Sequence, residues 1–356
     1  MKKGVMMMAH IVMATTLGAK QVYVNEVPFP EERMEITFLQ QPEATNKSDA
    51  ALVVDYTQDG AKVFLVDGGM PNCTALKALW DLRADLLLKM GKKHEERNPD
   101  YKLRFSCLIT HCHPDHIDEL TNHVMPSKLL ELEDLYLPEA TGLATDGSWQ
   151  DNHNSDMTQR VALMAQIAQY QKQASIHEVP FGTKEEVPIA EGSIEMYGPV
   201  VDWGKNAALK AIIDTYYAEA SPEKRKSDVP TAVINSNSVW YRIIFQHRSI
   251  LFTGDVLKKA GREDEPFDRM IDGYGADHLR SDIVKYPHHG ILRNPAAPRL
   301  VGELMIDARN SFVVVSAQSA RRESVPVLES FHVPVRDSSK KSVRFSIAKS
   351  EITELP

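Results

Sequence analysis

Four side chains that can bind metal are concentrated between positions 111 and 116 of the sequence. His111, His113, Asp115 and His116 form an HxHxDH pattern directly after the apolar run 105–110. Imidazole nitrogens and carboxylate oxygens are ligands that suit zinc and similar divalent ions. Alternation at a strand end would place His111 and His113 on one side, while the following turn directs Asp115 and His116 towards a second ion. The spacing therefore predicts a binuclear metal site.

A pair of metal ions also needs a bridging carboxylate and ligands from distant segments, and two later segments supply them. The apolar segment 249–253 is followed by a glycine, which permits close backbone approach, and then by Asp255, which can bridge two cations. The apolar segment 283–286 is followed by a proline and then by His288 and His289. We expect His289 to be the ligand and His288 to be its neighbour in the site.

In this order the motifs resemble those of the metallo-β-lactamase superfamily, which has an early Asp at a strand end, HxHxDH, a further His, a bridging Asp and a last His. Asp67, after the apolar segment 63–66, matches the early Asp. Within the superfamily, the chain is most similar to the hydrolase domain of the bacterial DNA-internalisation competence protein and its free-standing relatives, over roughly residues 35–347. The secondary motifs that carry this likeness are Thr37-Phe-Leu39, Ile194-Glu-Met-Tyr-Gly-Pro199, Asn235-Ser-Asn-Ser-Val239, Pro287-His-His-Gly290, and Val313-Val-Val-Ser316 followed by Arg321 and Pro326.

The chain departs from the family pattern beside two of the motifs and at one ligand. After HxHxDH the family usually has Ile-Gly-Gly, whereas this chain has Ile117-Asp118-Glu119. After the HHG it usually has Ser, whereas this chain has Ile291. The segment in which the intermediate His might fall reads Tyr197-Gly198-Pro199 and contains no histidine. The first ion would then keep His111, His113 and Asp255 plus water, an open arrangement typical of catalytic zinc. A single-metal form is the alternative, and His153, in the polar stretch 151–155, is the reserve ligand.

The expected fold class is α/β. Apolar segments separated by helical stretches fit a four-layer αββα metallo-β-lactamase-like sandwich of two mixed sheets flanked by helices. Helices are expected at 74–90, where an apolar stripe faces the core, and at 156–174. We expect a single hydrolase domain over residues 31–350, with an insertion near 125–180 beside the mouth of the active site. The expected strands lie at 35–39, 51–55, 62–66, 105–110, 194–197, 239–245, 249–253, 282–286, 312–316 and 343–347.

Composition agrees with a globular enzyme, because 356 residues with 43% hydrophobic side chains are enough for one large domain. The net charge of −8 argues against broad nucleic-acid binding, and we expect a small-molecule or nucleotide-like substrate.

Three cysteines favour free thiols or a reducing compartment, with Cys112 packing away from the ligands. Residues 1–30 are expected to be either an N-terminal extension or a signal segment. A cytoplasmic location is favoured, and secretion is the alternative if the segment is a signal peptide. No other segment is apolar enough to span a bilayer, and the oligomeric state is not predicted.

The predicted reaction is hydrolysis by water that two divalent ions activate, with zinc as the favoured metal and manganese as the alternative. Such ions lower the pKa of water, so that hydroxide can attack a phosphorus or carbonyl centre near neutral pH. Asp67 and Asp115 are expected to orient ligands or manage the proton of the water, and His288 to donate a hydrogen bond or a proton to the leaving group.

The substrate is the least determined part of this prediction. A phosphodiester or related phosphate ester is favoured, while the alternatives are a carboxylic ester, a lactone or a β-lactam, or a metal-binding protein without turnover. Lys285 and Arg293 flank the two late histidines and could stabilise an anionic substrate if they face the site. The basic run 224–226 is expected to be a solvated loop.

Overall fold

The computed structural model describes residues 22–24, 29, 31–40, 48–71, 74–90, 101–139, 156–200, 234–256, 266–291, 296–307 and 309–356. The expectations for His153, Arg293, the basic run 224–226 and most of the segment 1–30 lie outside these residues. In the described part of the chain, no helix is both long enough and apolar enough to cross a membrane.

The described strands form two sheets that share one pattern of connection. In each sheet, antiparallel strands at one side continue into parallel strands at the other, so both sheets are mixed. The first sheet has the order β16 (Glu351–Leu355), β15 (Val343–Ala348), β2 (Arg33–Phe38), β3 (Ala51–Thr57), β4 (Gly60–Val66), β5 (Tyr101–Leu108), β6 (Leu130–Pro138), β7 (Ser175–Val179), with β1 (Val22–Tyr23) beside β5. The second has the order β14 (Val335–Asp337), β13 (Phe312–Val315), β12 (Ile283–Lys285), β11 (Arg248–Phe252), β10 (Trp240–Phe245), β9 (Gly192–Tyr197), β8 (Lys184–Ile189).

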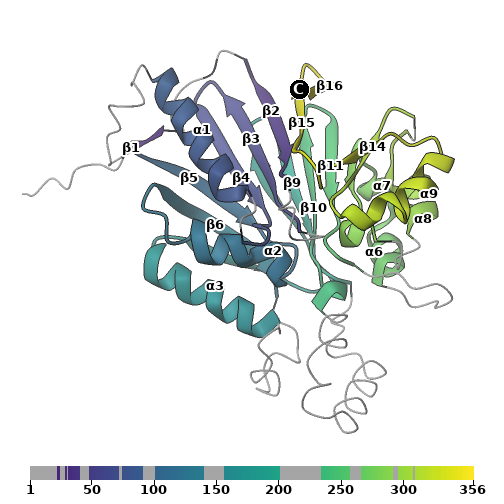
Figure 1. Cartoon of the computed structure of the whole chain (residues 1–356), viewed down its shortest axis with the longest axis horizontal. Helices are drawn as coiled ribbons and strands as arrows, with labels where there is room; N and C mark the ends of the chain where they lie inside the picture. Colours follow the sequence, from purple (N-terminus) through teal and green to yellow (C-terminus); the bar gives the residue numbers. More distant parts are fainter. Residues whose placement is uncertain are drawn as a thin grey trace, which may run out of the picture.

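The two sheets pack face to face, with helices on the two outer faces (Figure 1). One apolar cluster lies between the sheets, where Phe38 of β2 contacts Phe252 of β11 with ring centroids 5.6 Å apart. Further clusters lie between each sheet and its helices. The predicted αββα sandwich is therefore confirmed. The helices are α1 (Ala75–Lys89), α2 (Pro114–Glu119) and α3 (Asp156–Tyr170) on the first sheet, and α6 (Pro266–Tyr274), α7 (Ala276–Leu279), α8 (Ala297–Arg299) and α9 (Ser324–Ser330) on the second.

The expected strands and helices are all present, with shifts of a few residues at their ends. The segment 125–180, which we expected to be an insertion, contributes much of its described length to the main architecture. Its strands β6 and β7 extend the first sheet in parallel from β5, and α3 packs in the helical layer that covers that sheet. Residues 140–155 lie outside the described part, so the position of an active-site loop there stays a prediction.

The strand order brings several strand ends to one edge of the sandwich. The parallel pairs β4–β5 and β11–β12–β13 place their carboxyl ends together within each sheet. The antiparallel register that pairs Ala51 with Val66 adds the start of β3 to the same edge. Residues that directly follow β4, β5, β11, β12 and β13, or directly precede β3, can therefore form one site.

Candidate metal centre

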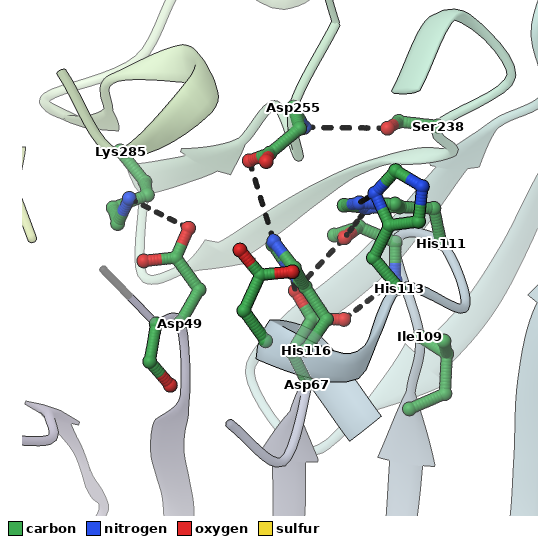
Figure 2. A network of polar contacts seen from close by, with 12 residues as sticks. Asp49, Asp67, Ile109, His111, His113, His116, Ser238, Asp255 and Lys285 are labelled. Carbon is green, nitrogen blue, oxygen red and sulfur yellow. Dashed lines mark hydrogen bonds and ion pairs between the residues drawn. The ribbon is translucent and has the colours of Figure 1, made fainter. Parts of the chain in front are cut away.

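Buried histidines and carboxylates meet at this edge of the sandwich, as Figure 2 shows for the part around His116. The rings of His111 and His116 lie 4.0 Å apart between centroids, and those of His116 and His289 lie 5.3 Å apart. One ligand atom from each of Asp49, His116, Asp255 and His289 lies within 4.8 Å of the others. Residues separated by up to about two thirds of the chain thus converge on a volume that could hold a metal ion.

His116 is held between two carboxylates. Its Nδ1 lies 2.9 Å from Oδ2 of Asp67, and its Nε2 lies 3.3 Å from Oδ1 of Asp255. Asp67 is itself fixed by the backbone N–H and the hydroxyl of Thr110, which both donate at 2.8 Å. Burial alone would lower the pKa of His116, but the charges of Asp255 and Asp67 raise it to about 10. Asp67 therefore fixes the ring so that Nε2 points into the site.

The Thr110 hydroxyl also determines the tautomer of His111. Its single proton goes to Asp67, so it can only accept from Nδ1 of His111, which lies 3.1 Å away. Nε2 of His111 then keeps its lone pair and faces Nδ1 of His113 at 3.1 Å. Burial, with the neighbouring His116 and His113, holds the pKa of His111 well below its usual value. His111 is a neutral imidazole in the form that binds metal.

His289 repeats the arrangement of His116 from the second sheet. Its Nε2 lies 3.1 Å from Oδ2 of Asp255 and 3.2 Å from Oδ2 of Asp115. On the other side of the ring, Nδ1 lies 3.3 Å from Oδ2 of Asp49 and 3.4 Å from the hydroxyl of Ser316. One ring cannot present both nitrogens to the same ion, so Asp49 and Asp115 must have different roles. Asp115 shares the inner side with Asp255, and Asp49 lies behind the ring.

Asp49 is itself held by two buried partners. Nζ of Lys285 lies 2.9 Å from Oδ2 of Asp49, and the hydroxyl of Ser316 donates to Oδ1. Burial would raise the pKa of Asp49, yet the charges of Lys285 and His289 hold it well below its usual range. Asp49 is thus an ionised carboxylate whose charge Lys285 largely balances. Such a group is better suited to orient a histidine than to bind an ion directly.

The backbone around the late histidines is strained in a way that fits a functional site. His288 and His289 both adopt positive φ angles, 50° and 59°, and Asp67 has a φ of 53°. Left-handed conformations are uncommon for residues other than glycine and persist only where surrounding structure enforces them. The turn that they form directs the side chain of His289 inward and leaves that of His288 partly exposed, at 16%.

The buried groups fit a divalent cation. Nε2 of His116 and Oδ1 of Asp255 are both buried and lie 3.3 Å apart, and neither atom makes a hydrogen bond to any other group among the described residues. An unsatisfied buried nitrogen and carboxylate oxygen are costly unless a further group satisfies them. A metal ion that both atoms bind would remove this cost.

Every site residue proposed from the sequence lies at or beside this centre. Asp67, His111, His113, Asp115, His116, Asp255 and His289 are buried there, and His288 lies at its rim with Nε2 at 3.9 Å from Oδ2 of Asp255. Lys285 is buried and paired with Asp49, so the condition under which it could stabilise an anionic substrate, that it face the site, is not met. Cys112 packs in the apolar cluster outside the first sheet, as predicted.

Asp49, Thr110 and Ser316 also belong to the site, although none of them had been given a role from the sequence. Thr110 directly precedes the HxHxDH motif, so a search for hydroxyls beside predicted ligands would have found it, whereas Ser316 ends the motif Val313-Val-Val-Ser316 and is far in sequence from every predicted ligand. Asp49 precedes a strand, and only its place two residues before the apolar run of β3 offered a weak signal. No further histidine joins His111 and His113 within the described residues; those beyond the cluster, such as His123 and His177, are exposed or half-buried.

Comparison with known proteins gives structural neighbours but no relatives by sequence. No family model matches the chain, and no curated protein matches it. A long form RNase Z from yeast aligns with a TM-score of 0.35 and 10% identity, over 91% of this chain and 49% of that one. Zinc-bound PqqB from Methylobacterium extorquens aligns with a TM-score of 0.37 and 10% identity, over 83% of this chain and 85% of that one.

A third neighbour is the metallo-β-lactamase SMB-1 in a complex with mercaptoacetic acid, with a TM-score of 0.28 and 13% identity over 78% of this chain and 87% of that one. The chain spans about half the length of the yeast RNase Z. The assignment of a function therefore depends on the geometry of the site.

Proposed function

We propose that this chain is a metal-dependent hydrolase of the metallo-β-lactamase superfamily that cleaves a phosphodiester or a related phosphate ester. The observation that carries the proposal is the matched support of two histidines. His116 is backed by Asp67 and His289 by Asp49, and the Nε2 atoms of both rings face Asp255. Carboxylate-backed histidines around a shared carboxylate are the arrangement expected of a catalytic metal site. The motif resemblance described above supports phosphorus over carbonyl as the reacting centre.

We assign the ligands in two groups that share Asp255. Asp115, His116 and His289 would hold one ion with Asp255, and His111 and His113 would hold the other. Zinc suits this mixture of imidazole and carboxylate, and manganese is an alternative. Two ions of this kind lower the pKa of water and stabilise negative charge on the reacting phosphorus group. The residues 31–350 would form a single hydrolase domain.

The roles of the protein side chains follow from their positions. Asp67 and Asp49 keep the two rings in the tautomer that presents Nε2. His288 is the proton donor to the leaving oxygen, because its side chain lies at the rim and remains partly accessible. Asp115 faces Nε2 of His289 and would share the inner side of the site with any water there.

Turnover of bis(p-nitrophenyl) phosphate tests this proposal. The protein is stripped of metal, reloaded with zinc or with manganese, and compared with Asp115→Ala and with His123→Ala, a control in an exposed histidine of the helical segment Leu120–Val124. Release that depends on metal, is absent from Asp115→Ala and is kept by His123→Ala is the expected result. No release despite two bound equivalents would favour esters, lactones or β-lactams. Failure to bind metal would favour a degenerate protein without turnover.

A further inference from the structure

A polar cleft of about 1040 Å³ lies at the same edge of the second sheet as the metal centre. Three cationic side chains line it, Arg321, Arg322 and Lys340, against a single acidic one, Glu323. The chain as a whole carries a net charge of −8, so this local excess of positive charge runs against its composition. The remaining lining residues are polar: Gln40, Gln318, Ser319 and Ser339.

The cleft adjoins the metal centre through the loop after β13. Ser316 in this loop contacts both Asp49 and His289, and the next residue, Ala317, donates its N–H to the carbonyl of His289 at 3.0 Å. Gln318 follows and is the first residue of the loop to line the cleft. The parallel strands β12, β13 and β14 thus lead in order to His289, to this loop and to the segment 338–340. Ligands commonly bind at such carboxyl ends of parallel strands.

The hydrogen-bond donors that line the cleft differ in whether other protein groups already bind them. Arg321 is bound to Asp337, which balances part of its charge. In the described residues, no ion pair holds the side chain of Arg322 or Lys340, and both are exposed. Ser339 is only 4% exposed, and its hydroxyl has no hydrogen-bond partner among the described residues. A buried hydroxyl without a partner indicates a missing acceptor.

We propose that this cleft binds a second phosphate group of the substrate, next to the phosphodiester that is cleaved at the metal centre. Arginine, lysine and a serine hydroxyl all donate hydrogen bonds, and the arginine and lysine side chains also carry positive charge. This is the chemistry that recognises phosphate oxygens. The inference rests on the proposed hydrolysis of phosphodiesters. It names the substrate class as a nucleotide-type molecule with two neighbouring phosphates, rather than a neutral ester or a diester with one phosphate.

Two substrates that differ only in this phosphate test the inference. The ratio of kcat/KM for the 5′-phosphorylated dinucleotide pTpT to that for TpT is measured on the zinc-loaded enzyme. The wild type should prefer pTpT, and Arg322→Gln with Lys340→Gln should lower the ratio by about tenfold, the effect of losing charge-assisted hydrogen bonds, while TpT is unaffected. Ser339→Ala should lower the ratio less.

A matched control removes two positive charges from residues that do not line the cleft. Arg309→Gln with Lys341→Gln changes exposed residues that do not line the cleft and should leave the ratio at its wild-type value. A wild type without preference for pTpT, or a ratio that the cleft variant leaves unchanged, would overturn the inference. Equal losses in the cleft variant and the control would also overturn it, since the effect would then come from net charge alone.

Binding of inorganic phosphate separates this inference from the proposed function. Calorimetric titration of phosphate into the zinc-loaded protein needs no turnover. If no phosphodiester is cleaved, the proposed function fails. The anion site in the cleft is still supported if the Arg322→Gln, Lys340→Gln variant loses phosphate binding and the control keeps it. Identical phosphate binding by wild type and cleft variant would refute the site itself.

Discussion

Replacing Asp49 by asparagine should weaken metal binding without removing a ligand. Asp49 lies behind the ring of His289, 3.3 Å from Nδ1, and is held by Lys285 at 2.9 Å and by Ser316. Asparagine keeps the size of the side chain but loses its charge. His289 would then lose the carboxylate that fixes its tautomer and its orientation towards Asp255.

Two effects of this substitution can be given magnitudes. Loss of an orienting carboxylate typically lowers metal affinity by about 10–100-fold, which is about 1.4–2.8 kcal/mol. The substitution also leaves Lys285, which is only 6% exposed, without its countercharge. Breaking a buried ion pair in this way costs about 3–5 kcal/mol of folding free energy, against a total of about 5–15 kcal/mol for a typical domain. The variant should remain folded but be markedly less stable.

A second variant separates these two effects. Asp49→Asn combined with Lys285→Met removes the uncompensated charge, so its stability should recover towards that of the wild type. Its zinc affinity should stay low, because Nδ1 of His289 still lacks a carboxylate. Urea unfolding of the metal-free proteins measures the first quantity, and competition with a chelator measures the second. Asp134→Asn is the control, since Asp134 makes a similar contact at 2.9 Å with the half-exposed His177.

Wild-type zinc affinity in both Asp49 variants would refute the orienting role. A fall in stoichiometry from two ions to one, with unchanged affinity for the other, would instead make Asp49 a direct ligand. Asp49 would then bind the ion itself and would not act only through the ring of His289.

Three further outcomes follow from the site and its surroundings. Asp115→Asn should lower the occupancy of one ion and the activity together, as metal analysis of the purified variant would show; full occupancy with full activity would sink the ligand assignment. His116, with its pKa of about 10 in the metal-free protein, carries a proton at pH 7. Although burial alone would lower it, the charges of Asp255 and Asp49 also raise the pKa of His289 well above its usual value, so metal must displace a proton from each ring. Zinc affinity should therefore rise by about a hundredfold per pH unit near pH 7, and calorimetry in buffers of different ionisation enthalpy should detect proton release; binding at pH 7 without release contradicts this. Gly254→Ala should destabilise the fold by about 1–3 kcal/mol, because Gly254 has a φ of 56° and a Cβ there would lie 2.7 Å from Ser238, whereas Gly302→Ala, with nothing within 4 Å, should not; equal unfolding midpoints for the two variants would count against it.

The strands that the sequence predicted are those whose burial leaves a clear apolar pattern. β4 and β11 are apolar runs in the interior of their sheets, and the candidate site residues Asp67 and Asp255 follow them within three positions. β8 and β16 are edge strands with many exposed charged side chains, so their patterns resemble loops. β6 is an interior strand, but it lies in the segment that we expected to be an insertion. Local hydrophobicity thus identified the inner strands except β6 and missed the edge strands β7, β8, β14 and β16.

The sequence by itself determined which side chains follow a strand and could bind metal. His111, His113, Asp115 and His116 belong to one continuous motif, and Asp255 and His289 each end an apolar run, so local spacing was enough to find them. Ligand chemistry and strand geometry are both properties of short segments, which is why this part of the site could be predicted.

Only the tertiary structure decided how those candidate ligands are supported. Asp49 and Lys285 are separated by 236 positions in the sequence and meet because the antiparallel register of β3 and β4 and the parallel alignment of β11 and β12 bring their strand ends to one edge. The cationic cleft arises in the same way, from loops after β13 and β14 that no local pattern places beside His289. Contacts of this kind depend on the register between strands and the packing of one sheet against the other, and these are set by the whole chain at once.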